Sequence, residues 1–215
     1  MNDNRAKQTR MIRTVFRELL KDVCTCVPGH VLAFDQARQL AQVQVGIQRV
    51  DINNASFTVP PIIEVPVCFP GGDFAMEYQI DPGCEGLIHF SQRCVDGWLQ
   101  SGGVAANPIG RFHNLQDALF MPGYRSLPNV LPDFQNNGIR LRNETGDQFA
   151  WLKNDGSIAV ENAAGHIRIA ADGTVTINGA TITPAGDVVS ATGISLSTHA
   201  HGGVQSGGSN TGAPV

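Results

Sequence analysis

Near the N-terminus, apolar side chains fall in adjacent pairs that return every four residues, which is the spacing of one stripe along an α-helix. The stripe consists of Met11, Ile12, Val15, Phe16, Leu19 and Leu20. Pro28-Gly29 interrupts the pattern soon after it. The sequence therefore predicts a helical arm within residues 1–27, which either packs on its own domain or docks on a neighbouring subunit.

From His30 the pattern changes to short segments in which apolar and polar side chains alternate. The clearest of them mixes four glutamines with Leu40, Val43, Val45 and Ile47, as in a half-buried strand. Further strands are expected at residues 62–67, 77–80 and 86–90, separated by Pro-Gly turns. About five strands in this length fit a small closed barrel, for which the OB-fold is the commonest candidate. We therefore expect an OB-fold domain over residues 28–104.

The next segment, residues 105–138, is rich in proline. It contains Pro108, Pro122, Pro128 and Pro132. This density predicts an extended linker with one short helical turn at residues 114–120. A catalytic module would not fit into so short a connector.

After Gly138, apolar residues two positions apart occur in short pairs. The pairs are Ile139/Leu141, Ile158/Val160, Ile167/Ile169, Val175/Ile177 and Ile194/Leu196. Turn sequences separate them, at Asn154-Asp155-Gly156, Ala164-Gly165, Asp172-Gly173, Asn178-Gly179, Ala185-Gly186 and Thr192-Gly193. Each strand offers only two or three inward side chains and leaves its edges unpaired, so these strands cannot bury a core inside one chain.

Strands of this kind are covered when they stack around an axis that is shared with sister chains. We therefore expect residues 139–197 to form the shaft of an intertwined homotrimer, a β-helix or β-prism. Ile and Val would face the axis, and Thr, Ser, Asn and Arg168 would face outward. An ordinary β-sandwich is the alternative that the pattern leaves open.

Composition supports an all-β fold, because charged residues make up only 16% of the chain and glycines number 24. The net charge of −4 argues against a nucleic-acid partner. Since no apolar run is long enough for a membrane span and the N-terminus lacks a signal-peptide core, we expect synthesis in a cytoplasm. The five cysteines show no CxxC pair and are expected to be reduced thiols.

The chain end, residues 198–215, contains His199 and His201. In an extended strand, positions i and i+2 face the same side, so both imidazoles can point at one centre. Two nitrogens hold a metal weakly, but three chains would supply six. An octahedral cage of neutral imidazoles suits a first-row transition ion such as iron, nickel or zinc. His199 and His201 are therefore the predicted metal ligands.

An enzyme is not expected. An oxygenase-type site needs a carboxylate beside a histidine pair, and neither Asp, Glu nor His follows His201. Six ligands would also leave no open coordination position for a substrate. The chain lacks a GxSxG nucleophile motif. Turn or surface roles are expected for Asp81, Glu85 and Asp96, rather than a pair that cleaves glycosides.

Several stretches, in order along the chain, resemble one known family. Residues 193–204, with the sequence GISLSTHAHGGV, resemble the apex of the phage baseplate assembly protein V family, the central spikes of contractile tails. Residues 65–72, 82–87 and 96–98 resemble the OB-fold domain of those spikes, and residues 113–123 resemble the segment that follows it.

The resemblance implies a structural virion protein of the tail baseplate, which would pierce the host cell envelope when the sheath contracts. It implies a homotrimer with an OB-fold collar, a β-prism shaft and a tip where His199 and His201 of three chains hold one iron ion. The N-terminal region would contact the tail hub, and assembly would take place in the host cytoplasm. The alternative is an OB-fold module that recognises oligosaccharide or nucleic acid through aromatic and basic side chains.

Overall fold

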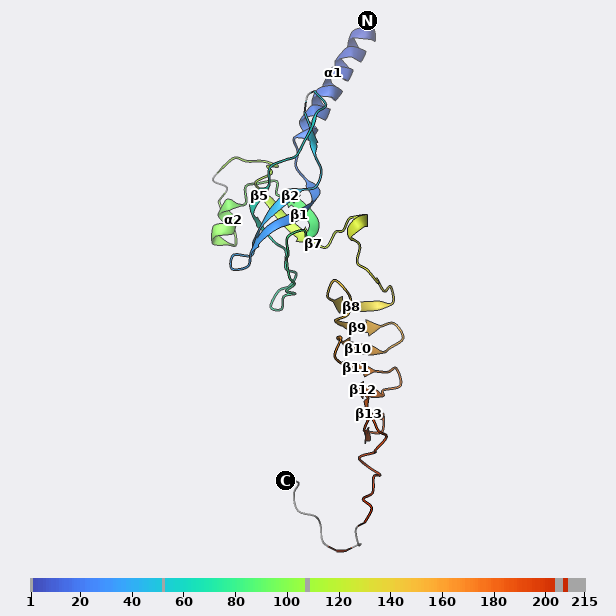
Figure 1. Cartoon of the computed structure of the whole chain (residues 1–215). Coiled ribbons are helices and arrows are strands. Elements are labelled where there is room, and N and C mark those ends of the chain that lie inside the picture. The colour runs from blue at the N-terminus through green and yellow to red at the C-terminus, as the bar shows by residue number, and fades with distance from the viewer. Residues whose placement is uncertain (1, 52, 107–108, 204–206, 209–215) are drawn as a thin grey trace. The chain divides into compact units, whose positions relative to one another are not determined.

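The structure, a computed structural model, describes residues 2–51, 53–106, 109–203 and 207–208. It divides into two compact units, residues 1–129 and residues 130–215. Strands make up most of the secondary structure in both units, as the all-β prediction requires (Figure 1). Within the described residues, no helix has the length and apolar character of a membrane span.

The first unit begins with helix α1 (Asn2–Lys21), which ends before the Pro28-Gly29 break. All the apolar side chains of its stripe are at least half exposed, from Val15 at 52% to Met11 at 68%. In the described part of the chain, the stripe is therefore not covered by its own domain.

A five-stranded antiparallel sheet follows, with strand order β5-β2-β1-β6-β7. Its strands are β1 (Cys26–Asp35), β2 (Leu40–Val45), β5 (Ile62–Pro66), β6 (Glu85–Phe90) and β7 (Ala118–Pro122). A parallel bridge between Val67 and Phe120 brings the two outer strands together, and the amide of Cys68 donates to the Phe120 carbonyl at 2.8 Å. The sheet is thus curled so that its edges meet. A separate hairpin pairs β3 (Arg49–Val50) with β4 (Ser56–Phe57).

The curled sheet encloses the hydrophobic core. The buried residues are Val31, Ala41, Val43, Val45, Val59, Ile62, Val65, Val67, Ile80, Ile88, Ala118 and Phe120. Phe120 is 1% exposed, and its ring lies over Gly86, where an added Cβ would be 2.6 Å from a ring carbon. The alternation predicted along β2 is confirmed for Val43 and Val45, but the third buried residue of this strand is Ala41, and Leu40 is only partly buried, on the other face. Ile47 lies beyond the end of the strand and is 55% exposed.

The predicted linker and one predicted strand differ from the structure. Residues 114–120, expected as a helical turn in an extended connector, lead into β7, which supplies Ala118 and Phe120 to the core. The alternating pattern of β7 is short and lies in a proline-rich segment, so the sequence did not predict a strand there. Residues 77–80, expected as a strand, form a loop that contributes only Ile80 to the core. The remaining elements of this unit are helix α2 (Asp96–Ser101) and the 3-10 turn η1 (Leu127–Asn129).

The second unit is one seven-stranded antiparallel meander, in which each strand pairs with its neighbours in the sequence (Figure 1). The strands are β8 (Gly138–Arg142), β9 (Phe149–Lys153), β10 (Ile158–Glu161), β11 (His166–Ile169), β12 (Val175–Ile177), β13 (Ala180–Ile182) and β14 (Val188–Val189).

The glycine turns predicted for this unit are confirmed. At Gly173, for example, φ is +91°, and its amide donates to the carbonyl of Ala170 at 2.9 Å. The short strands were expected to have unpaired edges within one chain, and this expectation is wrong, because each strand pairs with its neighbours in the sequence. What the chain does not supply is a cover for the face of the sheet: Ala159 is the only buried apolar residue among those described in this unit.

Candidate functional site

The strand register gathers the apolar side chains of the meander onto one face. Because side chains directly opposite each other in a ladder point to the same side, the pairings define two apolar columns. The first column is Ile139, Leu152, Ile158, Ile169, Val175, Ile182 and Val188. The second is Leu141, Ala150, Val160, Ile167, Ile177 and Ala180.

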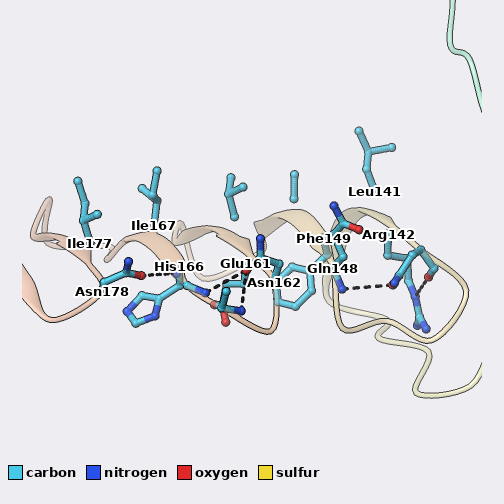
Figure 2. Close-up of a pocket in the computed structure, with 15 residues that line it drawn as sticks. Leu141, Arg142, Gln148, Phe149, Glu161, Asn162, His166, Ile167, Ile177 and Asn178 are labelled. Atoms are coloured by element: carbon cyan, nitrogen blue, oxygen red, sulfur yellow. Dashed lines mark hydrogen bonds between the residues drawn. The ribbon is translucent and has the colours of Figure 1, made fainter.

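These columns are open to solvent in the single chain. Leu141 is 66% exposed, Val160 50% and Ile167 47%. Figure 2 shows Leu141, Ile167 and Ile177 on one side of the ribbon and His166 on the other. The surrounding strands line an open groove of about 720 Å³. A continuous apolar face of this kind marks an association surface.

The opposite face of the meander is polar and internally paired. Arg168 donates to both carboxylate oxygens of Glu161, at 2.6 and 2.7 Å, and this hydrogen bonding lowers the pKa of Glu161. The Arg140 guanidinium lies 4.1 Å from the ring centre of Phe149 and 5.1 Å from that of Trp151. This face carries the charged and aromatic side chains of the first strands, so the two faces of the sheet differ sharply in chemistry.

The apolar face leads into the chain end, where one carboxylate organises the backbone. Asp187 accepts hydrogen bonds from the Ser195 hydroxyl at 2.6 Å, the Ser197 hydroxyl at 2.7 Å and the Ser197 amide at 3.0 Å. The hydrogen bonds from Ser195 and Ser197 lower the pKa of Asp187. Asp187 thus fixes the turn that immediately precedes His199.

That turn also fixes the orientation of the first histidine. The backbone carbonyls of Ser195 and Leu196 lie 2.9 and 3.1 Å from His199 Nδ1. A carbonyl oxygen only accepts, so Nδ1 carries the proton and the lone pair of the neutral ring is at Nε2. The Nε2 atom of His199 is therefore the one available to bind a cation.

The second histidine lies beside the first, although not in the expected strand. Residues 196–198 form a turn instead of an extended segment. The His199 and His201 rings are nevertheless adjacent, with centroids 5.1 Å apart and planes at 80°, and both side chains are exposed. The rest of the predicted apex lies partly outside the described residues.

The first unit contains a second group of side chains that could ligate a metal, but the guanidinium of Arg111 lies among them. The ligand atoms of Cys94, Asp96 and Asp117 lie within 4.8 Å of one another. Arg111 Nη2 contacts all three, at 3.1 Å from the thiol, 2.9 Å from Asp96 and 2.7 Å from Asp117. Asp117 is fully buried and also accepts from the amide of Val95. The guanidinium forms hydrogen bonds to both carboxylates and to the thiol, so this group is a structural network.

The carboxylates considered for glycoside cleavage also have structural partners. Glu85 accepts from the amide and hydroxyl of Ser126 and from the side chain of Asn129, and these bonds lower its pKa. The hydrogen bond from Arg111 lowers the pKa of Asp96. Asp81 accepts from the side-chain amide of Gln79. The expectation of turn and surface roles agrees with these contacts.

Both regions with family resemblance match known family models. Residues 27–123 match the phage protein Gp138 N-terminal domain, and residues 193–215 match the GpV apex motif. No curated protein matches the chain at a significant level.

Both matched families are phage baseplate and central-spike families, so the resemblance stated from the sequence is confirmed. The chain is thus a structural phage tail protein, and the families place it in the tail of the virion, in interaction with other tail proteins. Residues 27–123, which contain the curled five-stranded sheet (called the barrel from here on), are similar to the Gp138 N-terminal domain. The chain end carries the apex motif, which is associated with metal binding.

Sequence reasoning did not find the supporting residues of either unit. Asp187 precedes the alternating serines Ser195 and Ser197, whose hydroxyls suit a carboxylate, but this spacing is not a recognised motif. Arg111 and Asp117 lie in the segment that was expected to be a linker, where no core role was sought.

Proposed function

We propose that this chain is the trimeric central spike of a contractile tail baseplate and pierces the host cell envelope on sheath contraction. The observation that carries the proposal is the apolar face of the second unit, which is open in one chain and ends at the apex motif. The spike would consist of an OB-fold collar, an intertwined trimeric β-helix shaft and a metal-binding apex.

The shaft proposal follows from the two apolar columns. Three copies that turn this face toward a common axis would bury Ile, Leu and Val against one another and leave the paired charges of Glu161 and Arg168 in water. Burial of one such side chain contributes about 1.5–3 kcal/mol. The columns contain thirteen residues per chain, so the trimer would gain the core that each chain lacks.

The collar proposal is supported by the barrel topology. A five-stranded antiparallel sheet whose outer strands, β5 and β7, meet through a parallel bridge is the arrangement of a small, partly open barrel. Together with the family match over residues 27–123, this favours an OB-fold for the region predicted to have one.

For the apex, we propose that His199 and His201 of three chains hold one transition-metal ion, and that the ion is iron. Adjacent imidazole ligands on an octahedral ion, bound at about 2.0–2.1 Å, have ring centres about 4.5 Å apart. The observed 5.1 Å requires only a small adjustment. The carbonyls that accept from His199 Nδ1 supply the outer-shell contact that metal-bound histidines usually have.

The role of such an ion is structural. Six imidazoles would fill its coordination sphere and leave no position for a substrate, so the proposal includes no catalysis. The ion would tie three chains together at the narrow end, where apolar burial is smallest. A spike under mechanical load must resist unfolding, which depends on its kinetic stability. Strands that are buried against two sister chains would slow the rate of unfolding.

The experiment that tests this function combines native mass spectrometry with elemental analysis of the purified, untagged protein. We expect a trimer with one iron per three chains. The His199→Ala/His201→Ala variant should remain trimeric and lose the metal, whereas the control His166→Ala should keep it. A monomer at micromolar concentration would refute the shaft, and a full metal load in the double variant would refute the apex.

A further inference from the structure

We propose that neighbouring chains of the shaft also bind each other at its corners, where the side-chain amide of Asn162 of one chain lies between Asp155 and Asp172 of the next. The starting observation is that the two edges of the meander carry different side chains. The proposal rests on the trimeric shaft of the proposed function and adds to it a polar contact between chains, separate from the apolar face.

The turns of the meander alternate between the two edges of the sheet, because each strand runs antiparallel to the one before it (Figure 1). We call these edges the first and the second edge. The first edge carries the turns at residues 143–148, 162–165 and 178–179. The second edge carries the turns at residues 154–157, 170–174 and 183–187.

The middle turn of the first edge is held by a side-chain amide. Asn162 Oδ1 accepts hydrogen bonds from the backbone amides of Ala164 and Gly165, at 2.8 and 2.9 Å. The side-chain nitrogen of Asn162 has two N–H groups, and it donates to no other residue in the described part of the chain. Because Asn162 is exposed, these two donors are available to a neighbouring chain.

The turns of the second edge are held by carboxylates instead. Asp155 Oδ1 accepts from the amide and the hydroxyl of Ser157, at 2.8 and 2.6 Å, and Asp172 Oδ1 accepts from the amide of Thr174 at 2.9 Å. These hydrogen bonds lower the pKa of both carboxyl groups, so both are ionised at neutral pH. An ionised carboxylate has about four lone-pair positions, which leaves room for a further donor.

The spacing of the turns brings the two edges into register. In a shaft with threefold symmetry, the first edge of each chain meets the second edge of the next chain at the same height. Strands are about 4.8 Å apart, so the turns of the two edges are staggered by about that distance. The turn at residues 162–165, between β10 and β11, therefore falls midway between the turns that contain Asp155 and Asp172 of the next chain.

One side-chain amide between two carboxylates can donate one N–H to each, and hydrogen bonds to a charged acceptor are stronger than neutral ones. The proposal is placed at Asn162 rather than at the turn at residues 143–148, because that turn also contains the acidic residues Glu144 and Asp147. A neutral donor at the first edge thus avoids the repulsion that a carboxylate would meet at this corner.

The test uses the equal shape of asparagine and aspartate. Asn162→Asp keeps the oxygen that holds its own turn and places a third carboxylate between Asp155 and Asp172 of the next chain. We expect the dissociation constant of the trimer, measured in urea by sedimentation equilibrium, to rise by about tenfold or more, because like charges would be in contact. Salt at about 1 M should remove most of this difference, since the Debye length is then about 3 Å.

The rescue experiment moves the charge from one edge to the other. Asn162→Asp/Asp155→Asn/Asp172→Asn has an amide at the second edge and a carboxylate at the first, so complementarity is restored. Its dissociation constant should return to within about threefold of that of the unmodified chain. Asp155→Asn/Asp172→Asn alone places amides at both edges and should also stay trimeric.

The matched control is Asn114→Asp, because Asn114 Oδ1 accepts from the amide of Gln116 at 2.9 Å in a similar turn of the barrel unit. We expect its trimer to be unchanged. An unmodified trimer that Asn162→Asp does not weaken, or that the triple variant does not restore, would overturn the corner contact and leave the spike proposal intact. A monomeric unmodified chain would overturn the shaft and, with it, the corner contact.

Discussion

The barrel and the meander are built from strands of similar composition but hold their apolar side chains in opposite ways. The barrel closes on itself around Phe120, Ile88 and Val43, each at most 1% exposed. The meander has as regular a pattern, yet Leu141, Val160 and Ile167 remain about half exposed or more. A sheet buries its apolar face when it curls on itself or packs against another layer of the same chain, and the ladder of short strands in the meander does neither.

The difference teaches that the same alternating pattern predicts burial in one region and association in the other. In the barrel, the Val67–Phe120 bridge joins the sheet edges within one chain. In the meander, β8 and β14 lie at opposite ends of the strand order. Stability should therefore be independent of protein concentration in the barrel and dependent on it in the meander.

The largest effect is expected from charges placed on the open face. Val160 and Ile167 are cross-strand partners there, and Val160→Asp/Ile167→Asp should abolish the trimer, because six carboxylates would be buried without counter-ions. The control Thr176→Asp/Thr181→Asp alters a cross-strand pair on the polar face and should stay trimeric. Sedimentation equilibrium measures the oligomeric state of both variants. A trimeric Val160→Asp/Ile167→Asp variant would show that the open face of the meander is not the association surface.

The second effect is a cavity in the barrel. Phe120→Ala should lower the free energy of unfolding of the barrel by about 3–5 kcal/mol, since a fully buried ring is removed. Trp98 lies in the barrel unit and Trp151 in the meander, so single-tryptophan versions follow each unit separately in denaturant. An equal loss in the Trp151 signal would show that the two units unfold together.

A smaller effect should appear at the chain end. Asp187→Asn loosens the turn that orients His199 and should weaken metal binding by about 10- to 100-fold while the trimer remains. Asp172→Asn is the matched control, because Asp172 accepts from the amide of Thr174 in a similar turn of the meander. Metal competition with a chelator gives both affinities, and equal affinities would remove Asp187 from the positioning role.

The smallest effect is an acid dependence in the barrel unit. The amide of Ser126 is the largest cause that holds the pKa of Glu85 below its usual value. Because the pKa of Glu85 is lower in the folded state, its hydrogen bonds stabilise the fold above the pKa of the unfolded state, about 4.3. This contribution is lost as the pH falls through the lower pKa of the folded state. Glu85→Gln should flatten this part of the stability profile, and an unchanged slope below pH of about 4.3 would contradict it.

Much of this architecture was visible in the sequence because periodicity and turn chemistry are local. The four-residue pairs predicted α1, and the glycine turns marked the meander. The strand β7 was missed, because Ala118 and Phe120 are core residues only through pairing with β6, a partner almost thirty residues earlier. The loop at residues 77–80 shows the reverse, since its alternating pattern has no ladder to join.

At the chain end, the residue types were predictable and their support was not. The HxH pattern identified His199 and His201 as candidates, but the contact between Asp187 and Ser195 depends on how β14 returns past the final turn. The Arg111–Asp117 pair likewise depends on a tertiary contact with the segment around Cys94. Contacts between distant positions of this kind leave no periodic trace in a single sequence.

The neighbour-only pairing of the meander makes its length adjustable. Each strand adds about 4.8 Å to the stack and touches only the strands before and after it. A hairpin inserted or removed at a glycine turn would lengthen or shorten the stack by about 10 Å and leave every other pairing as it was. The length of the meander can therefore change in fixed steps of one hairpin.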